Sequence, residues 1–135
     1  TPFIPVDREA LVEEFHKAFD HPVKGEWTPE LLSLRSALIG EESLELLEEF
    51  KWLAETPPEE WETADKERLL KEMADLQYVL SGAAVALGLN LEGAYIRVHK
   101  SNMSKLGEDG KPVRREDGKV LKGPNYRPPI LEDLL

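Results

Sequence analysis

Five glutamates gather in one short stretch of the chain, and they are the side chains best suited to chemistry. They fall within Ile39–Phe50, which otherwise has the pattern of a leucine-rich helix: Glu41, Glu42, Glu45, Glu48 and Glu49. At about 100° per residue they cover an arc of roughly 120°. Like charges at these spacings repel by roughly 0.2–0.5 kcal/mol per pair, and no lysine or arginine lies between Arg35 and Lys51. The cluster needs a counter-charge, although a solvated face is an equally good interpretation for Glu48 and Glu49.

A second acidic pair, Glu72 and Asp75, lies about 60° apart on one face of a later helical pattern that is otherwise apolar. Burying unpaired carboxylates is costly, so two on each of two facing helices call for a divalent cation. Ligation by carboxylate oxygens alone is the preference of Mg²⁺ or Mn²⁺ rather than zinc. We therefore predict a metal site formed by Glu42 and Glu45 together with this pair.

Helices must position these carboxylates, and the sequence predicts four of them. Asp7, Thr28 and Asn90 are suited to cap helix starts, and Gly88 is suited to cap a helix end. The expected helices cover about 7–20, 28–55, 66–87 and 91–106. This pattern favours an all-α fold with a four-helix bundle-like core of antiparallel helices.

The chain changes character after Gly107, where glycine, proline and charged residues dominate. Asp117-Gly118 between two short runs predicts a β-hairpin that sets Glu116 opposite Lys119. An isolated two-stranded ribbon is marginal in water. We expect this C-terminal hairpin and the extended segment after it to lie on the helices or to be ordered by a ligand, within a single domain of residues 1–135.

Composition and charge argue against several classes of function. The net charge of −10 argues against nucleic acid as the main partner, because duplex binding requires a basic surface. No apolar stretch approaches the ~18 residues that span a bilayer, and the chain has no cysteine for a disulfide or a thiolate metal site. We therefore expect a soluble, cytoplasmic protein with neither a membrane nor a nucleic-acid partner.

Charge is distributed unevenly along the chain. Residues 1–96 hold 8 basic and 21 acidic side chains, whereas residues 97–135 hold 9 basic and 6 acidic ones. A site that binds both metal cations and phosphate groups requires both kinds of charge. A basic tail that neutralises an acidic body is an equally good interpretation.

The two acidic motifs, in this order, resemble a known signature. Glu41-Glu42-x-x-Glu45 followed by Glu72-x-x-Asp75 is similar to the E-E-x-x-E and E-x-x-D motifs of the MazG-like all-α nucleoside triphosphate pyrophosphohydrolases. This superfamily includes dimeric dUTPases, dCTP pyrophosphatases and phosphoribosyl-ATP pyrophosphohydrolases. The resemblance is nearest to members that prefer dUTP.

Two later segments extend the resemblance. His99–Lys105 resembles the S-N-x-S-K element that follows the third core helix in many members, and Gly118–Tyr126 is similar to the tail of a bacterial and phage branch. The resemblance therefore covers about Leu34 to Tyr126.

The resemblance implies a reaction and a set of roles. Members cleave a nucleoside triphosphate between the α and β phosphorus atoms, which gives the monophosphate and pyrophosphate. The matching positions imply that Glu42, Glu45, Glu72 and Asp75 hold Mg²⁺ (or Mn²⁺), and that Glu41 orients or deprotonates the attacking water.

Substrate-binding candidates lie later in the chain. We expect Lys105 to neutralise phosphate charge during catalysis and Asn102 to donate a directional hydrogen bond to sugar or phosphate. Lys122 and Tyr126 lie on a segment expected to close over the substrate. Lys100 is a weaker candidate, for which ordinary surface solubility is the better interpretation.

Recognition of the base is left open by the sequence. Several side chains could stack on a base or hydrogen-bond to it, and each is equally plausible as a packing residue: His16, Trp27, Trp52, Trp61 and Tyr95. Arg35 could contact a phosphate or form an ion pair.

The expected function is metal-dependent hydrolysis of dUTP, with phosphoribosyl-ATP, dCTP or a modified nucleotide as the alternative substrate. Apolar residues nearly all round the helix at 28–55 favour a homodimer. The competing class is a non-catalytic helical dimerisation module.

Overall fold

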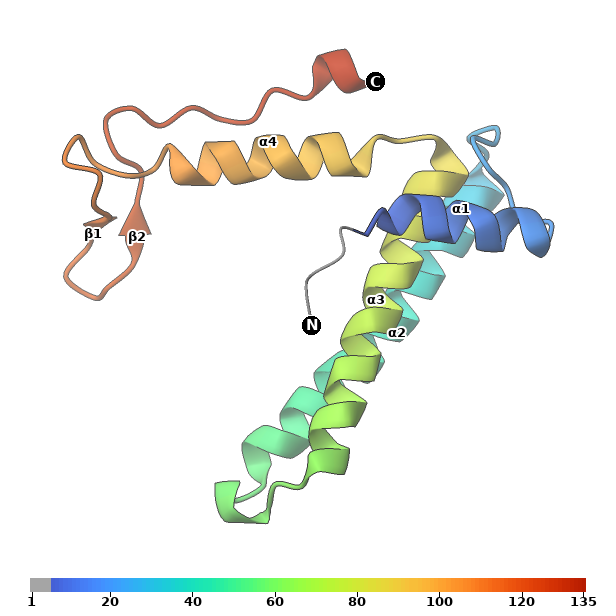
Figure 1. The fold of residues 1–135 in the computed structure, drawn as a ribbon, viewed down its shortest axis with the longest axis horizontal. Helices are drawn as coiled ribbons and strands as arrows, with labels where there is room; N and C mark the ends of the chain where they lie inside the picture. Colours follow the sequence, from blue (N-terminus) through green and yellow to red (C-terminus); the bar gives the residue numbers. More distant parts are fainter. Residues whose placement is uncertain (1–5) are drawn as a thin grey trace. The chain divides into compact units, whose positions relative to one another are not determined.

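The computed structural model describes residues 6–135, which form four α-helices and one small sheet (Figure 1). The helices are α1 (Arg8–Ala18), α2 (Pro29–Glu55), α3 (Thr63–Leu87) and α4 (Leu91–Met103), and the strands are β1 (Val113–Arg114) and β2 (Val120–Leu121). Two short 3₁₀ turns, η1 (Pro58–Glu60) and η2 (Glu132–Leu134), complete the elements. The chain divides into two compact units, one ending at Gly88 and the other covering Leu89–Leu135. The prediction of an all-α fold with a C-terminal hairpin is confirmed.

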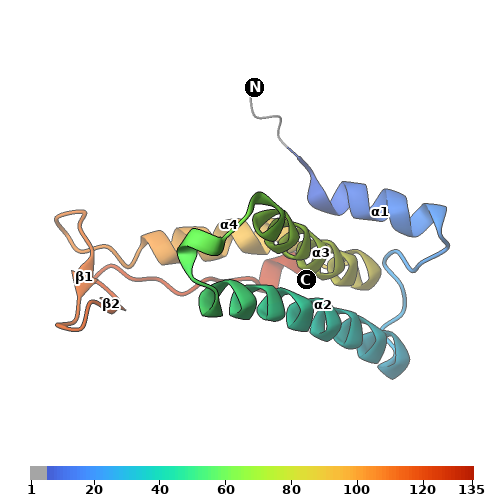
Figure 2. The same ribbon diagram turned by 90° about the horizontal axis from the view of Figure 1, so that it is seen from below.

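In the first unit, α2 and α3 run side by side in opposite directions (Figures 1 and 2). Thr28 caps α2 as predicted, because its hydroxyl accepts a hydrogen bond from Leu31 N at 3.1 Å. At the far end of α2 the Trp61 indole N–H donates to the carbonyl oxygens of Leu53 and Thr56, at 3.0 Å each. They lie at the C-terminal end of α2, where carbonyls lack the N–H group four residues later that would bind them inside a helix. Trp61 therefore fixes the linker between the two helices.

The third helix begins at Thr63, three residues before the predicted start. Glu62 N donates to the Asp65 carboxylate at 2.8 Å, which closes the first turn. Asp65 is buried and also accepts a hydrogen bond from Arg68. The helix ends at Leu87, and Gly88 with φ 70° forms the left-handed C-terminal cap that the sequence predicts.

The loop between α1 and α2 closes the end of α3. Lys24 N donates to Val85 O at 2.9 Å and Gly25 N donates to Ala86 O at 2.8 Å. The Trp27 indole N–H donates to Leu87 O at 2.8 Å. The last carbonyls of α3 are thus satisfied by the chain that enters α2, which fixes the start of α2 beside the end of α3.

The first helix packs on the second half of α3. Phe15 lies edge-on to Tyr78, with 5.6 Å between ring centroids. The buried apolar side chains here are small: Val12 on α1, and Ala84, Val85 and Ala86 on α3. Small side chains allow the two helices to approach closely.

In the second unit the tail returns along α4. Asn90 caps α4 as predicted, because its side chain accepts from Gly93 N at 2.9 Å. The helix ends at Met103, three residues before the predicted end. There the backbone changes to tighter i to i+3 hydrogen bonds, such as Lys105 N to Asn102 O at 3.1 Å. The returning tail is held by the ion pair between Arg97 and Asp133.

The hairpin forms where the sequence predicts it, but with a different register. β1 and β2 pair antiparallel, and beyond them Arg115 N donates to Lys119 O at 2.8 Å. Arg115 rather than Glu116 therefore lies opposite Lys119, so the predicted pairing is wrong. Gly118 has φ 88° and closes a three-residue loop, which requires one left-handed residue.

Among residues 6–135, no single helix has both the length and the apolar character needed to cross a bilayer. Only α3 and α4 taken together meet this criterion, as a broken pair, and core helices of soluble proteins meet it as well.

Candidate active site

Four carboxylates from the two long helices of the first unit lie together. Glu42 and Glu45 project from α2, and Glu72 and Asp75 project from α3. Each offers one oxygen, and these oxygens all lie within 4.8 Å of one another. The structure thus brings together the four residues that the sequence groups as metal ligands.

The carboxylates are half-buried rather than fully enclosed. Glu42 Oε2 and Glu72 Oε2 are nevertheless inaccessible to solvent and have no hydrogen-bond partner in the described part of the chain. Buried carboxylate oxygens are normally paired. Their orphaned state fits a divalent cation that takes oxygen ligands.

Glu42 shows the electrostatic consequence of this crowding. Its pKa is raised, first by burial and then by the neighbouring carboxylates of Glu45, Asp75 and Glu72. A cation among these oxygens would remove the repulsion that raises the pKa.

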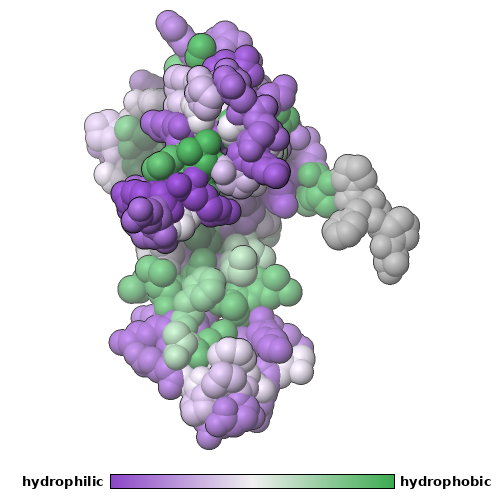
Figure 3. All heavy atoms as spheres, turned by 90° about the vertical axis from the view of Figure 1, so that its left-hand side faces the viewer, coloured by the Kyte–Doolittle hydropathy of each residue, from purple (hydrophilic) through white to green (hydrophobic). Residues whose placement is uncertain are grey.

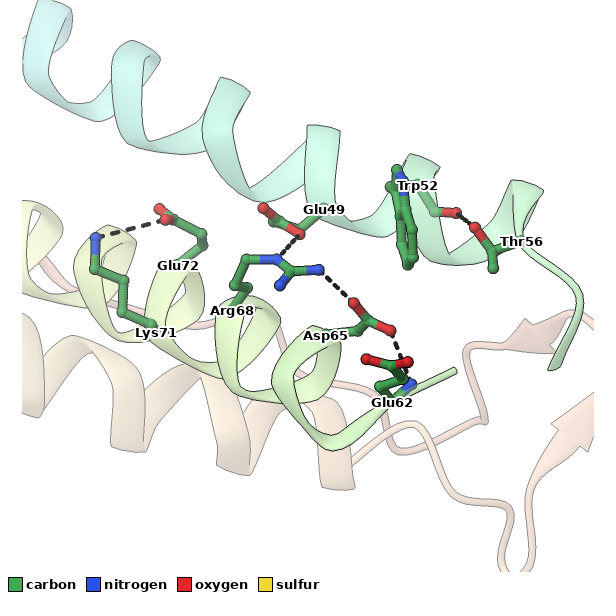
Figure 4. Close-up of polar contacts among 8 residues, drawn as sticks. All are labelled: Glu49, Trp52, Thr56, Glu62, Asp65, Arg68, Lys71 and Glu72. Atoms are coloured by element: carbon green, nitrogen blue, oxygen red, sulfur yellow. Dashed lines mark hydrogen bonds and ion pairs between the residues drawn. The ribbon is translucent and has the colours of Figure 1, made fainter. Parts of the chain in front are cut away.

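An ion-pair network adjoins the cluster (Figure 4). Glu49 Oε2 on α2 lies 3.6 Å from Arg68 Nε on α3, and Arg68 also binds Asp65. Glu49 is therefore a link between the two helices, whereas Glu48 is exposed. Arg68 lies 5.8 Å from the ring centroid of Trp52.

Lys71 supplies part of the missing counter-charge and is not among the residues predicted from the sequence. Its Nζ lies 2.7 Å from Asp75 Oδ2 and 3.5 Å from Glu72 Oε1 (Figure 4 shows the second contact). The signal was present, because Lys71 and Asp75 are four residues apart on one helix. Its side chain is 68 % exposed, so the pair is solvated and weak.

Glu41 lies next to Glu42 on α2 and is exposed. It is not one of the four residues whose oxygens converge. Its role at the attacking water remains a prediction.

The substrate-binding candidates belong to the second unit and gather at the end of α4. Lys100 and Asn102 are exposed on the last turns of the helix, whereas Lys105 just beyond it is half-buried. Lys122 Nζ lies 4.7 Å from the centroid of the Tyr126 ring. Gly123 N donates to Lys105 O at 2.9 Å, which places the segment that carries Lys122 and Tyr126 beside the end of α4. The action of these residues on the same substrate as the carboxylates remains a prediction.

The two serines of the S-N-x-S-K element bind the tail. The Ser101 hydroxyl donates to Arg127 O at 2.7 Å, and Arg127 N donates to the Ser104 hydroxyl at 3.0 Å. Both polar groups of one tail residue are thus held by the end of α4. A cavity of about 600 Å³ lies between this end and the tail, with Asn125 and Tyr126 in its wall.

The aromatic candidates for base binding divide into distinct groups. The indole N–H groups of Trp27 and Trp61 are bound to carbonyls at helix ends, which favours packing roles. Tyr95 is 73 % exposed. His16 is buried against the loop that follows α1.

Comparison with known proteins gives one family and one solved structure. The profile of the family described as phosphoribosyl-ATP pyrophosphohydrolase matches residues 12–102, which include both acidic motifs. The chain is similar to a candidate NTP pyrophosphohydrolase from Exiguobacterium sp. 255-15 at 23 % identity, over 93 % of this chain and 90 % of that one, with a TM-score of 0.45. No curated protein matches the chain.

Proposed function

Because the chain belongs to the phosphoribosyl-ATP pyrophosphohydrolase family and is thus a nucleotide pyrophosphohydrolase, we propose that it hydrolyses dUTP. Cleavage between the α and β phosphorus atoms gives dUMP and pyrophosphate. The observation that carries the proposal is the convergence of four carboxylates, two of them with orphaned buried oxygens. The preference for dUTP rests on the likeness of the motifs to dUTP-preferring members.

We propose that Glu42, Glu45, Glu72 and Asp75 hold Mg²⁺ or Mn²⁺. Bound there, the ions would neutralise phosphate charge and lower the pKa of a water molecule. Glu41 is exposed beside the cluster, where its carboxylate can orient the attacking water and accept its proton.

For residues of the second unit we propose roles in binding the phosphate and sugar groups of a nucleotide. Lys105 neutralises charge that develops on the phosphates, and Asn102 donates a hydrogen bond to phosphate or sugar. Lys122 and Tyr126 contribute from the tail, and Lys100 is a weaker contributor.

Phosphoribosyl-ATP is the second candidate substrate, because the matching family carries its name. Purified protein with Mg²⁺ or Mn²⁺ should be incubated with dUTP, dTTP, dCTP, UTP and phosphoribosyl-ATP, and the products separated. We expect pyrophosphate and the monophosphate, with dUTP turned over fastest. Release of orthophosphate would contradict cleavage at the α–β bond, and no turnover of any nucleotide would favour a non-catalytic helical module.

We also propose that the chain acts as a homodimer. Large apolar side chains on the two long helices are exposed: Leu44, Leu47 and Phe50 on α2, and Leu70 and Met73 on α3. Figure 3 shows hydrophobic side chains gathered in a band over α2 and α3. Contiguous apolar surface of this kind is typical of an interface.

A further inference from the structure

The cavity at the end of α4 has in its wall a cationic side chain to which the proposed function gives no role. The cavity has a volume of about 600 Å³ and lies within the second unit. Ligand sites usually measure about 300–1,000 Å³. The end of α4 forms one side and the tail forms the other: Met103, Ser104 and Leu106, and Asn125, Tyr126 and Arg127. Of the residues that line the cavity, Arg127 alone carries a charge.

The backbone of Arg127 is held at both of its polar groups by the end of α4. The Ser101 hydroxyl donates to Arg127 O at 2.7 Å, and Arg127 N donates to the Ser104 hydroxyl at 3.0 Å. The Ser104 hydroxyl in turn donates to Ser101 O at 2.6 Å. These bonds fix Arg127 at the cavity without using its guanidinium.

Ser101 is the most buried residue of the second unit. Within residues 89–135, all of which the structure describes, it is the one buried residue, at 6 % exposed. Large apolar residues of this unit are exposed, among them Tyr95 and Ile130. The hydrophobic effect is non-directional, whereas hydrogen bonds have directions. The serine hydroxyls therefore determine which residue of the tail faces the cavity.

The guanidinium of Arg127 has no acidic partner within the chain. Among residues 6–135, no carboxylate forms an ion pair with it. Two arginines of the same unit differ in this respect. Arg97 on α4 is paired with Asp133, and Arg115 in the hairpin is paired with Asp117. The charge of Arg127 is thus left for a ligand.

The negative end of the helix dipole is the alternative reason for a cation beside the end of α4. The carbonyls there already have donors. Ser104 N donates to Lys100 O at 3.0 Å, and beyond the helix Gly123 N donates to Lys105 O at 2.9 Å. These carbonyls do not need the guanidinium as a donor.

We propose that Arg127 binds a phosphate group of the nucleotide in this cavity. Its guanidinium offers paired N–H donors whose spacing matches the oxygens of a phosphate. Ser101 and Ser104 are positioning residues, because they hold the Arg127 backbone and leave its side chain for the ligand. The inference rests on the proposed function, since a nucleoside triphosphate supplies the phosphate. It adds a contact to those proposed for Lys105 and Lys122.

Binding of inorganic pyrophosphate tests this site apart from the metal. Calorimetry in EDTA keeps metal from the carboxylate cluster, so that the cluster repels the anion and does not contribute to its binding. We expect wild type to bind pyrophosphate and Arg127→Gln to weaken that binding by about tenfold or more, because a charged hydrogen-bond donor is lost. Absence of binding to wild type would overturn the proposal, as would wild-type affinity in Arg127→Gln.

Arg114→Gln is the control for net charge. It removes the same charge from an exposed position on β1, which is not among the residues that line the cavity. Its affinity for pyrophosphate should stay within about twofold of the wild-type value. Equal weakening by the two substitutions would be a general effect of charge and would overturn the proposal.

Hydrogen exchange at the end of α4 tests the alternative role at the helix dipole. If Arg127 stabilised the helix end, Arg127→Gln would speed exchange at Ser104 N and leave pyrophosphate affinity unchanged. We expect the opposite result, with unchanged exchange at Ser104 N and weakened binding.

A double-mutant cycle tests the positioning role of the serines. Ser101→Ala should weaken pyrophosphate binding by about threefold or more. In Arg127→Gln the same substitution should change the affinity by less than about twofold, because no guanidinium remains to be positioned. A serine with a merely structural role would weaken binding by the same factor in both backgrounds, and that result would overturn the positioning role.

Failure of the proposed function would give a different result. Binding of pyrophosphate that depends on Arg127, without release of pyrophosphate from any nucleotide, would refute the reaction and keep the phosphate site. Turnover of nucleotides with equal affinity for pyrophosphate in wild type and Arg127→Gln would keep the reaction and refute the phosphate site.

Discussion

At the carboxylate cluster, the side chains that are proposed to bind the metal also repel one another when no metal is bound. The oxygens of Glu42, Glu45, Glu72 and Asp75 lie within 4.8 Å of one another, and the nearby cation of the first unit, Lys71, is mostly exposed. Removing one charge and binding a cation both reduce this repulsion. Measurements of turnover and of the free energy of unfolding distinguish the two changes.

Glu45→Gln should reduce the turnover rate at least about a hundredfold, because it removes a carboxylate proposed to bind the metal. The free energy of unfolding without metal should stay constant or rise, since like-charge repulsion of roughly 0.2–0.5 kcal/mol per pair is relieved. Urea titration and pyrophosphate release measure the two effects. Glu48→Gln, at an exposed position of the same helix, serves as the control. Wild-type activity in Glu45→Gln would refute the ligand assignment.

The raised pKa of Glu42 predicts how stability depends on pH. The folded protein holds the Glu42 proton more tightly than the unfolded chain does, in which the pKa has its ordinary value near 4.5. Its contribution is therefore fully present below that value and is lost as pH rises through the raised pKa. Without metal, the Tm of wild type should fall across this range relative to that of Glu42→Gln. Saturating Mg²⁺ should reverse this trend, because the bound metal stabilises wild type through Glu42. Parallel Tm curves without metal would contradict the prediction.

The sequence predicts which carboxylates form the cluster better than it predicts the contacts of the charged residues around them. Helical periodicity and the two acidic motifs were sufficient to group the four carboxylates. The contacts of Lys71 depend on side-chain rotamers, and the ion pair of Glu49 with Arg68 depends on how α2 meets α3. The absence of a carboxylate near Arg35 within residues 6–88 could be seen only in the folded unit.

At the scale of elements, helix ends set by a single residue were predicted well. Asp7, Thr28 and Asn90 cap helix starts, and Gly88 caps an end, because each cap is a local interaction. Ends that depend on two residues were missed. The start of α3 uses Glu62 and Asp65, which precede the predicted helix at 66–87. The hairpin register depends on a three-residue loop.

Gly123 joins two elements of the second unit. Its N–H donates to Lys105 O at 2.9 Å, and an added Cβ would lie 2.4 Å from Leu106 O. Gly123→Ala should therefore displace the tail from α4 and reduce the free energy of its local opening by about 1–3 kcal/mol. Hydrogen exchange at Arg127 N measures this opening. Glu108→Ala, an exposed change outside the tail contact, should leave that exchange rate unchanged, and equal rates in both variants would contradict the prediction.

At the scale of the whole molecule, recognition of the superfamily from the two acidic motifs is confirmed by the family match. The balance of basic and acidic residues also differs between the two units. The first unit holds 8 basic and 20 acidic residues, and the second holds 9 and 7. The single-domain prediction and the preference for dUTP remain predictions, because neither follows from helix pattern or charge.

The proposed homodimer can be tested at its exposed apolar surface. Leu47 is 62 % exposed on α2, and a glutamate there would place an unpaired charge in the interface. Leu47→Glu should raise the dimer dissociation constant by about tenfold or more, measured by light scattering across a dilution series. Ala54→Glu, at an exposed position of the same helix, should remain dimeric. A monomeric wild type would refute the dimer, as would a Leu47→Glu variant that dissociates no more readily.

Residues spaced by seven along α2 and α3 also bear on how the two helices align. Arg35, Glu42 and Glu49 on α2 meet Gly82, Asp75 and Arg68 on α3. This is the heptad repeat of a coiled coil, with charged groups at positions that are usually apolar. Polar residues at such positions specify one alignment of the helices at a cost in stability. With a cation bound between them, Glu42 and Asp75 would therefore also favour this alignment of α2 and α3 over other heptad registers.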